Sequence, residues 1–248
     1  MQLEEYDALE KVEREHWFYK GKRVLTEYWI DREATLSPGN TIVDCGAGTG
    51  ELVSELKLRY EPQGISVIGI EYVEEARRLA RERKGTELLE GSILDLPLKD
   101  ATSQVTIALD VLEHVEDDKL AFSEMLRVTK PGGIIIINVP AFMSLWSDWD
   151  VSLGHFRRYS KGMLQEVLAP HRAKLQILHF DYANAFAFLP ILALRNISRL
   201  FKIKARFEDR IPSPGMNKML LDIFVGQSKS SWFHPPFGSS LFCVLRKR

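Results

Sequence analysis

The order of apolar and polar residues along the chain predicts strands that alternate with helices. Short apolar runs, rich in branched side chains, lie at residues 41–45, 66–71, 86–89, 104–109 and 133–139. Segments with apolar residues at helical spacing lie between them, at 51–60, 74–83 and 117–129. This alternation is typical of a doubly wound, mostly parallel α/β sheet with right-handed crossovers. The run at 133–139 is continuously apolar, which indicates a strand buried on both faces.

Segments on either side of this core extend the fold. Residues 3–33 have apolar positions at helical spacing and end before a Ser-Pro-Gly-Asn turn. Two further strands are predicted at 175–180 and 241–245, with helices at 183–206 and 217–227 between them. An insertion of roughly sixty residues favours a cap or a partner surface over a simple loop. We expect one domain over residues 1–248, made of a helical lid (1–36), a cofactor-binding core (37–182), a helical insertion (183–238) and a last strand (239–248).

Composition and charge narrow the function classes. The 33 Lys and Arg residues nearly cancel 34 Asp and Glu residues, which argues against nucleic acid as a partner. Two cysteines, Cys45 and Cys243, make a disulfide framework or a thiolate zinc cluster improbable. The N-terminus lacks the pattern of a signal peptide, and the longest apolar stretch, 183–194, is shorter than the ~20 residues of a membrane span. We therefore expect a cytoplasmic protein.

The strongest motif is a glycine-rich loop between the first predicted strand and the helix after it. It reads D-C-G-A-G-T-G from Asp44 to Gly50, and its glycines allow a tight turn and close approach of a ligand. Glu71 ends the second strand, where an acid can accept hydrogen bonds from ribose hydroxyls. The loop departs from the dinucleotide fingerprint G-x-G-x-x-G because Glu51 holds the last glycine position. A carboxylate there would repel a pyrophosphate, whereas Asp44 suits a cationic ligand.

With these residues the sequence resembles the class I S-adenosylmethionine-dependent methyltransferases, specifically the small-molecule groups of types 11, 12 and 23. The resemblance implies a seven-stranded Rossmann-like sheet, S-adenosyl-L-methionine as cofactor and S-adenosyl-L-homocysteine as product. It also implies that Glu71 binds the ribose and that Tyr72 packs on the adenine. The cradle of the cofactor's amino-acid part would then consist of Asp44, Gly46, Ala47, Gly48 and Gly50.

Two later segments resemble the same family. In E-G-S-I-L-D-L-P-L, Ser92 stands where the family usually has an acid facing the adenine amine, and Ser92 and Ile93 remain cofactor-binding candidates. In L-D-V-L-E-H-V, Leu109 and Asp110 follow a central strand and are expected to border the methyl donor. The Glu113-His114 pair after them is either structural, which the resemblance favours, or catalytic, and His114 is a substrate-binding candidate.

The segment after the fifth strand carries the pattern W-x-x-x-D-x-x-x-x-H-x-R-R-Y. It is similar to a bacterial and archaeal methyltransferase subgroup that is often found beside glycan-assembly enzymes. His155 is a candidate general base, oriented by Asp150. In the alternative interpretation, Asp150 forms a structural ion pair with one of the arginines and His155 caps a turn. Substrate-binding candidates here are Trp146, Arg157, Arg158 and Tyr159, since adjacent arginines suit a carboxylate or phosphate.

Two helical segments leave alternatives open. The E-H-W-F sequence also recurs in that subgroup, where it covers the cofactor, so Trp17 is expected at the cofactor site or, alternatively, as a core staple between helices. In helix 183–206 the basic residues Arg195, Arg199, Lys202 and Arg206 share one face. That face predicts either weak contact with a membrane surface or a solvated stripe.

These observations together predict methyl transfer from S-adenosylmethionine to a small acceptor that is anionic or glycan-linked. The absence of an N-P-P-Y pattern disfavours a nucleobase amine, and no spacing of Asp, Asn and His indicates a metal ion. Two alternatives remain open: a non-catalytic module or partner subunit that binds the cofactor, and an oxidoreductase that uses a dinucleotide. The sequence carries no signal for an oligomeric state.

Overall fold

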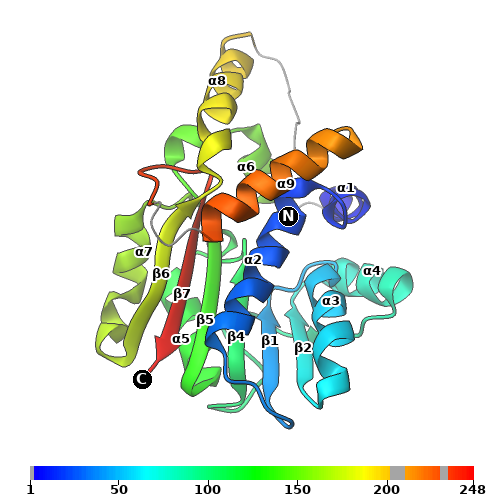
Figure 1. Cartoon of the computed structure of the whole chain (residues 1–248), viewed down its shortest axis with the longest axis vertical. Coiled ribbons are helices and arrows are strands. Elements are labelled where there is room, and N and C mark those ends of the chain that lie inside the picture. Colours follow the sequence, from blue (N-terminus) through cyan, green and yellow to red (C-terminus); the bar gives the residue numbers. More distant parts are fainter. Residues whose placement is uncertain (1–2, 202–209, 230–233) are drawn as a thin grey trace.

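The computed structural model describes residues 3–201, 210–229 and 234–248, which form a sheet covered by helices on both faces (Figure 1). The sheet has the strand order β3-β2-β1-β4-β5-β7-β6. Its strands are β1 (Thr41–Cys45), β2 (Ser66–Glu71), β3 (Leu89–Glu90), β4 (Ser103–Leu109), β5 (Thr129–Pro140), β6 (Leu175–Ala183) and β7 (Ser240–Lys247). Among the strands of the described residues, β7 alone runs antiparallel to its neighbours, β5 and β6. The predicted seven-stranded, mostly parallel Rossmann-like sheet is confirmed.

Helices pack on the two faces of the sheet in separate layers. Helices α2 (Trp17–Glu33), α3 (Glu51–Tyr60) and α9 (Pro214–Lys229) lie on one face, while α5 (Asp118–Val128) and α7 (Lys161–Leu168) lie on the other (Figure 1). Strand β5 contributes Ile134 and Ile136 to the first layer and Ile135 and Ile137 to the second. This alternation explains why the run is continuously apolar.

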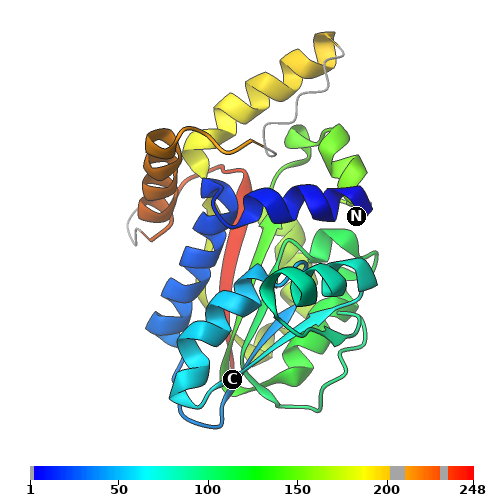
Figure 2. The same ribbon diagram turned by 90° about the vertical axis from the view of Figure 1, so that its right-hand side faces the viewer.

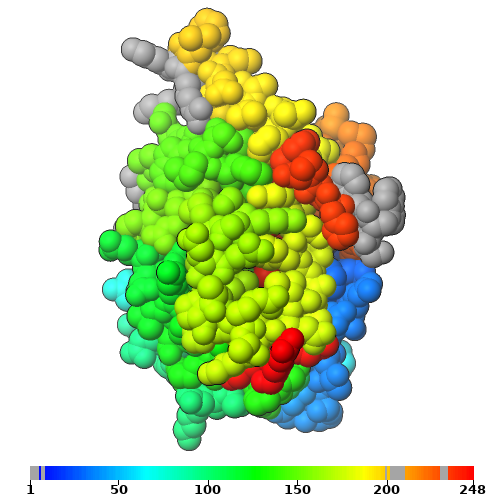
Figure 3. Space-filling view, turned by 90° about the vertical axis from the view of Figure 1, so that its left-hand side faces the viewer, coloured from blue at the N-terminus to red at the C-terminus, as the bar shows by residue number. Residues whose placement is uncertain are grey.

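The remaining helices gather around the carboxyl ends of the parallel strands (Figure 2). Here lie α1 (Leu3–Glu13), α6 (Asp148–Leu153) and α8 (Ala185–Phe201), while α4 (Glu74–Lys84) follows β2. The far end of α8 projects from the body of the molecule, as the space-filling view also shows (Figure 3). Short 3-10 helices span Glu61–Gln63, Leu112–His114, Met143–Leu145 and Ala169–Lys174.

Several predicted boundaries shift in the structure. The strand expected at 86–89 is the two-residue β3, and β5 begins at Thr129 because Thr129 already pairs with Ser103. The Lys-Pro-Gly-Gly turn therefore lies in an irregularity within β5, between that pair and the Ile134–Val105 pair. Helix α8 starts at Ala185, and the rest of the helix predicted to residue 206 lies outside the described residues. Among the described helices, none has both the length and the apolar character needed to cross a bilayer.

Candidate functional site

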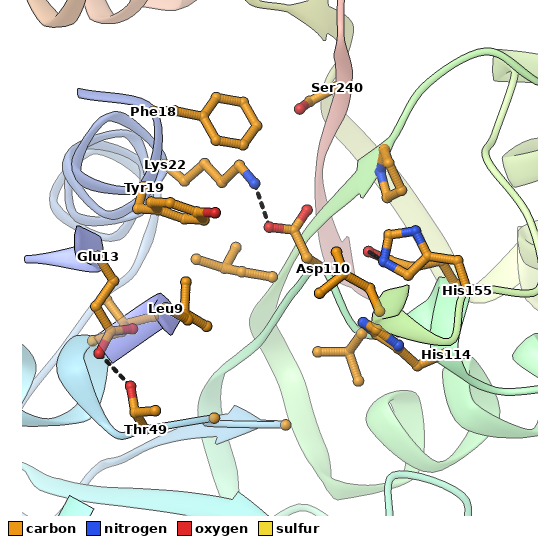
Figure 4. Close-up of a pocket in the computed structure, with 18 of the residues that line it drawn as sticks. Leu9, Glu13, Phe18, Tyr19, Lys22, Thr49, Asp110, His114, His155 and Ser240 are labelled. Atoms are coloured by element: carbon orange, nitrogen blue, oxygen red, sulfur yellow. Dashed lines mark hydrogen bonds and ion pairs between the residues drawn. The ribbon is translucent and has the colours of Figure 1, made fainter. Parts of the chain in front are cut away.

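A cavity of about 1140 Å³ opens at the carboxyl ends of the parallel strands (Figure 4). Its lining comes from the glycine loop, the ends of β2 and β4, the α1–α2 segment, the segment around α6, and α8. Ligands bind at this edge in open α/β sheets because the loops between strands and helices diverge there. The chain thus brings together residues from nearly its whole length at one edge of the sheet.

The glycine loop forms the floor of this cavity. Gly46 has a φ of 78°, and a Cβ at this position would lie 2.6 Å from a methyl carbon of Val111. Gly48 also has a positive φ, but open space surrounds it, and its backbone N–H donates to Glu71 at 2.8 Å. The first glycine is therefore required by packing and backbone conformation, and the second leaves the loop open toward the cavity.

Two buried carboxylates flank the loop. Asp44 lies beneath it, and burial followed by the nearby charge of Glu71 raises the pKa of Asp44 to about 7. Burial also raises the pKa of Glu71, although backbone N–H groups of Val73 and Gly48 oppose the shift by donating to its two oxygens. A cationic ligand that enters here would stabilise the charged form of both acids.

Asp110 marks the centre of the cavity. It follows β4 with a φ of 55°, a left-handed conformation that is uncommon for a residue with a side chain. Its carboxylate forms an ion pair with Lys22 of α2 and accepts a hydrogen bond of 2.7 Å from Asn138 of β5 (Figure 4). Lys22 also lies 3.9 Å from the ring centre of Phe18. The expected residue Asp110 is in the cavity, and it is held there by Lys22, which the sequence analysis did not identify.

The α1–α2 segment covers one side of the cavity. The Glu13 carboxylate accepts hydrogen bonds from Thr49 of the glycine loop and from Lys84, the latter at 2.8 Å. The Trp17 backbone N–H donates to Asn217 of α9 at 2.9 Å. Trp17 lines the cavity and also packs against Phe186 and Phe224. Trp17 thus packs between helices and also lies at the cavity, and its contact with the cofactor stays a prediction.

Charged side chains converge at the opposite end of the cavity. Asp150 accepts a hydrogen bond from Nδ1 of His155 at 3.0 Å and another from Nε of Arg158 at 2.6 Å. Arg195 of α8 comes within 3.5 Å of the same carboxylate. Burial alone would raise the pKa of Asp150, but its bonds to His155 and Arg158 lower it to about 2. Asp150 thus both orients His155 and pairs with Arg158.

His114 and Glu113 complete this end of the cavity. The His114 ring packs edge-on against the His155 ring, with centroids 4.6 Å apart. Burial, followed by the neighbouring His155, lowers the pKa of His114 to about 3. Burial and the charge of Asp110 raise the pKa of Glu113 well above its usual range. The imidazole of His114 is therefore neutral at physiological pH.

Most of the predicted site residues line this one cavity, and four do not. Besides the residues described above, Ala47, Tyr72, Ser92, Ile93 and Leu109 line it as expected. Gly50 instead caps α3. Arg157 pairs with Asp118, Tyr159 donates its hydroxyl to the same carboxylate, and Trp146 is not among the lining residues. The structure thus places these three outside the lining residues, and their contact with the acceptor stays a prediction; Trp149 is the tryptophan of this segment that lines the cavity.

Arg195 also departs from its expected role. The side chain is 11% exposed and lines the cavity, so it is not part of a solvated stripe. The side chain of Arg199 and the whole of Lys202 and Arg206 lie outside the described residues. Arg195 is a basic residue in a mostly apolar helix, whereas Lys22 lies among other charged residues of α2 and carries no such signal.

Comparisons with known proteins agree with this geometry. Residues 43–137 match the family model described as a methyltransferase domain. A 37.1 kDa protein in transposon TN4556 of Streptomyces fradiae is 30% identical over 166 residues, 65% of this chain and 48% of that protein. A probable S-adenosylmethionine-dependent methyltransferase of Mycolicibacterium smegmatis is 28% identical over 163 residues, 63% of this chain and 59% of that protein. The chain thus spans about half the length of the curated relatives it matches.

Solved structures show the same fold at lower identity. A methyltransferase of Thermotoga maritima, described as a possible histamine N-methyltransferase, has a TM-score of 0.58 and 19% identity over 99% of this chain and 95% of its own. The geranyl diphosphate C-methyltransferase of Streptomyces coelicolor A3(2), solved with Mg²⁺, geranyl diphosphate and S-adenosyl-L-homocysteine, has a TM-score of 0.58 and 16% identity over 92% of this chain and 79% of its own. A Haloferax volcanii complex between the Trm112 activator and a methyltransferase scores 0.56 at 17% identity over 89% of this chain and 92% of its own.

Proposed function

We propose that this protein, whose chain carries a class I S-adenosylmethionine-dependent methyltransferase domain, transfers the cofactor's methyl group to a small acceptor that is anionic or glycan-linked. The observation that carries the proposal is the division of charge along one cavity. Asp44 and Glu71 lie at the end formed by the glycine loop, while Arg158 and Arg195 lie at the other end. This arrangement suits a cationic donor at the first end and an anionic acceptor at the second.

The cofactor end has the groups that S-adenosylmethionine requires. Each oxygen of Glu71 accepts one backbone hydrogen bond and keeps a lone pair for a ribose hydroxyl. Asp44, once ionised, attracts the ammonium and sulfonium groups of the donor. Tyr72 is largely exposed at the cavity rim, where an adenine ring can stack on it. Solved structures of the same fold contain the cofactor or its product, which supports this assignment.

The acceptor end supports an anionic group more directly than it supports a glycan. The guanidinium groups of Arg158 and Arg195 are both nearly buried beside His155, and each can donate to a carboxylate or phosphate. A glycan-linked acceptor rests on the sequence resemblance alone. Exposed apolar side chains on α8, namely Leu189, Ile197, Leu200 and Phe201, support weak contact with a membrane surface as part of the same proposal.

Methyl transfer is an in-line displacement. A lone pair of the acceptor attacks the methyl carbon, the carbon–sulfur bond breaks, and the sulfur keeps the bonding electrons. Because the sulfonium is already a good leaving group, positioning and exclusion of water are the main contributions of the protein. A hydroxyl or amine acceptor must also lose a proton, and Nε2 of His155 can accept it because Nδ1 is bonded to Asp150.

The proposal also assigns roles to the segments of the chain and a cytoplasmic location to the protein. Residues 1–36 act as the lid, residues 37–182 as the cofactor-binding core, and residues 183–238 as a cap that contributes Arg195. The last strand (239–248) closes the sheet between β5 and β6. Cys45 and Cys243 are buried and unpaired, as is typical of proteins in a reducing cytoplasm.

Turnover tests this function. The protein is incubated with S-adenosylmethionine and a bacterial metabolite extract, and the S-adenosylhomocysteine formed is measured. We expect product formation by the wild type and by Lys119→Ala, which changes an exposed side chain on α5, and loss of product in Glu71→Ala. Binding of the cofactor without turnover of any extract would favour the non-catalytic module. Tight binding of NADH without binding of S-adenosylmethionine would favour the oxidoreductase.

A further inference from the structure

Three potential metal ligands meet at the acceptor end of the cavity. Glu113, His114 and His155 each offer one atom, and these atoms all lie within 4.8 Å of one another. Nε2 of His155 is 4.0 Å from Oε1 of Glu113, too far for a hydrogen bond. Ligand atoms bonded to one small cation at about 2.0–2.2 Å lie roughly 3–3.5 Å apart. Small side-chain rotations would therefore bring the three atoms around a single ion.

Glu113 lacks the partner that a buried carboxylate needs. Its side chain is 0% exposed, and neither carboxylate oxygen takes a hydrogen bond from any residue within 3–201, 210–229 or 234–248. A buried carboxylate without hydrogen bonds is costly, and such groups in native proteins usually indicate an ion or water bound at the site. Glu113 also lines the cavity, so a ligand could reach it from there.

His155 is already oriented as metal ligands usually are. It bonds to Asp150 through Nδ1, which leaves the lone pair of Nε2 on the side of Glu113. Histidine ligands almost always donate their second ring N–H to a carboxylate or a backbone carbonyl, which fixes the tautomer and the ring plane. The His114 ring packs edge-on against the His155 ring, and one of its nitrogens lies within 4.8 Å of the ligand atoms of Glu113 and His155.

The neighbouring cations form ion pairs with other carboxylates. Arg158 and Arg195 contact the carboxylate of Asp150, and Lys22 contacts the carboxylate of Asp110. The charges of Lys22 and Arg158 favour the ionised form of Glu113, but burial outweighs them and raises its pKa. A divalent cation bonded to Glu113 would stabilise the ionised carboxylate at close range.

We propose that Glu113, His114 and His155 bind one divalent transition-metal ion. Two imidazoles and one carboxylate form a ligand set suited to zinc, iron(II), cobalt(II) or manganese(II) rather than to calcium. Three protein ligands leave further coordination positions open, as in catalytic metal sites. Those positions face the cavity, because all three side chains line it.

One consequence rests on the proposed function. An acceptor oxygen bound at an open position would lose its proton more readily, since a metal ion lowers the pKa of a coordinated hydroxyl. The proton passes to solvent, the oxygen attacks the methyl carbon, and the carbon–sulfur bond breaks. In the metal-bound protein, His155 would act as a ligand and the ion would replace it as the agent of deprotonation.

Cobalt(II) titration tests the site without any turnover. Purified protein is treated with a chelator, dialysed and titrated with cobalt(II), whose visible absorption reports nitrogen and oxygen ligands. We expect saturation at one ion per chain in the wild type and in His234→Ala, a histidine whose side chain is 63% exposed and bonded to Asp181. Glu113→Gln and His155→Ala should each weaken binding by roughly tenfold or more.

The outcome for the metal site can be distinguished from the outcome for the proposed methyl transfer. Circular dichroism of the metal-free variants shows whether they fold, and Glu113→Gln keeps the shape of the side chain. Absence of saturable binding in the wild type, or an affinity equal to that of the wild type in folded Glu113→Gln and His155→Ala, would overturn the metal site. Binding of S-adenosylmethionine to metal-free protein is measured in parallel, so that loss of either ligand identifies which proposal has failed.

Discussion

Lys22 of the N-terminal helix forms an ion pair with Asp110 at the end of the central strand β4. The two residues lie 88 positions apart in the chain, and their contact joins helix α2 to the point where the methyl donor is expected. Lys22 is only 4% exposed, so the pair is largely desolvated on the side of α2. Helix α2 is thus fixed to the carboxyl end of β4 by charge as well as by packing.

Loss of this ion pair should weaken both folding and cofactor binding. In Lys22→Met, Asp110 keeps its bond from Asn138 but loses its cation. Breaking a buried pair leaves an uncompensated charge, and because Asp110 is partly exposed we expect the free energy of unfolding to fall by about 1–3 kcal/mol. Urea unfolding measures this change. Lys20→Ala, an exposed neighbour on the same helix, is the control, and equal stability of the two variants would contradict the account.

The affinity for S-adenosylmethionine should fall at acidic pH. Burial and the charge of Glu71 raise the pKa of Asp44 to about 7, so below that pH the free protein carries a neutral Asp44. A cationic ligand requires the ionised form, so binding releases a proton and the affinity should drop by up to tenfold per pH unit below about 7. Calorimetry from pH 5.5 to 7.5 measures it. The Asp44→Asn variant should bind S-adenosylmethionine weakly, and its affinity should no longer depend on pH in this range. An unchanged pH dependence in this variant would mean that a group other than Asp44 titrates.

Alanine substitutions at two glycines of the loop, Gly46 and Gly48, should have different effects on stability and cofactor binding. In Gly46→Ala, the new Cβ meets Val111 at 2.6 Å at a positive φ, so backbone strain adds to overpacking and we expect a loss of about 2–5 kcal/mol in the free energy of unfolding. In Gly48→Ala, the new Cβ enters open space, so only the backbone strain of about 1–2 kcal/mol remains. Since Gly48 lines the cavity, this variant should instead bind the cofactor at least tenfold more weakly. Reversal of the two effects would contradict the assignment of the loop.

Alanine substitutions of the adjacent arginines, Arg157 and Arg158, should have different effects. Arg158→Ala removes a guanidinium from the cavity and should raise the KM for the acceptor by tenfold or more, with little effect on cofactor affinity. Arg157→Ala removes the partner of Asp118 outside the cavity, so it should lower the melting temperature and leave the KM unchanged. Steady-state kinetics with the acceptor found by turnover, together with thermal unfolding, distinguish the two. Equal KM values for the two variants would count against an anionic acceptor bound by Arg158.

The sheet and the position of the candidate cofactor residues were predictable because both depend on local sequence. Runs such as 133–139 form strands wherever both faces are covered, and parallel strands bring their carboxyl ends to one edge. Asp44, Glu71 and Asp110 each lie at or within one residue of the carboxyl end of a strand, so their meeting at the cavity follows from topology.

The acceptor end was less predictable because it depends on contacts between distant segments. The bond between Asp150 and His155 joins residues five positions apart, and the pattern indicated it. Three further residues line the same cavity from other elements, namely Glu113, Lys22 and Arg195. Hydrophobic periodicity in the sequence does not predict contacts between such distant segments. Arg157 and Arg158 are adjacent in a segment without regular secondary structure, and they pair with different carboxylates, those of Asp118 and Asp150. Of the two, only Arg158 lines the cavity, and their adjacency in the sequence did not indicate which one would.

Calorimetric titration with S-adenosylmethionine tests the central claim most directly. The account predicts saturable binding at one cofactor per chain for the wild type. It also predicts affinity weakened more than tenfold in Asp44→Ala and Glu71→Ala, with Lys119→Ala unchanged. A folded wild-type protein that produces no heat of binding, or that binds NADH in preference, would contradict it.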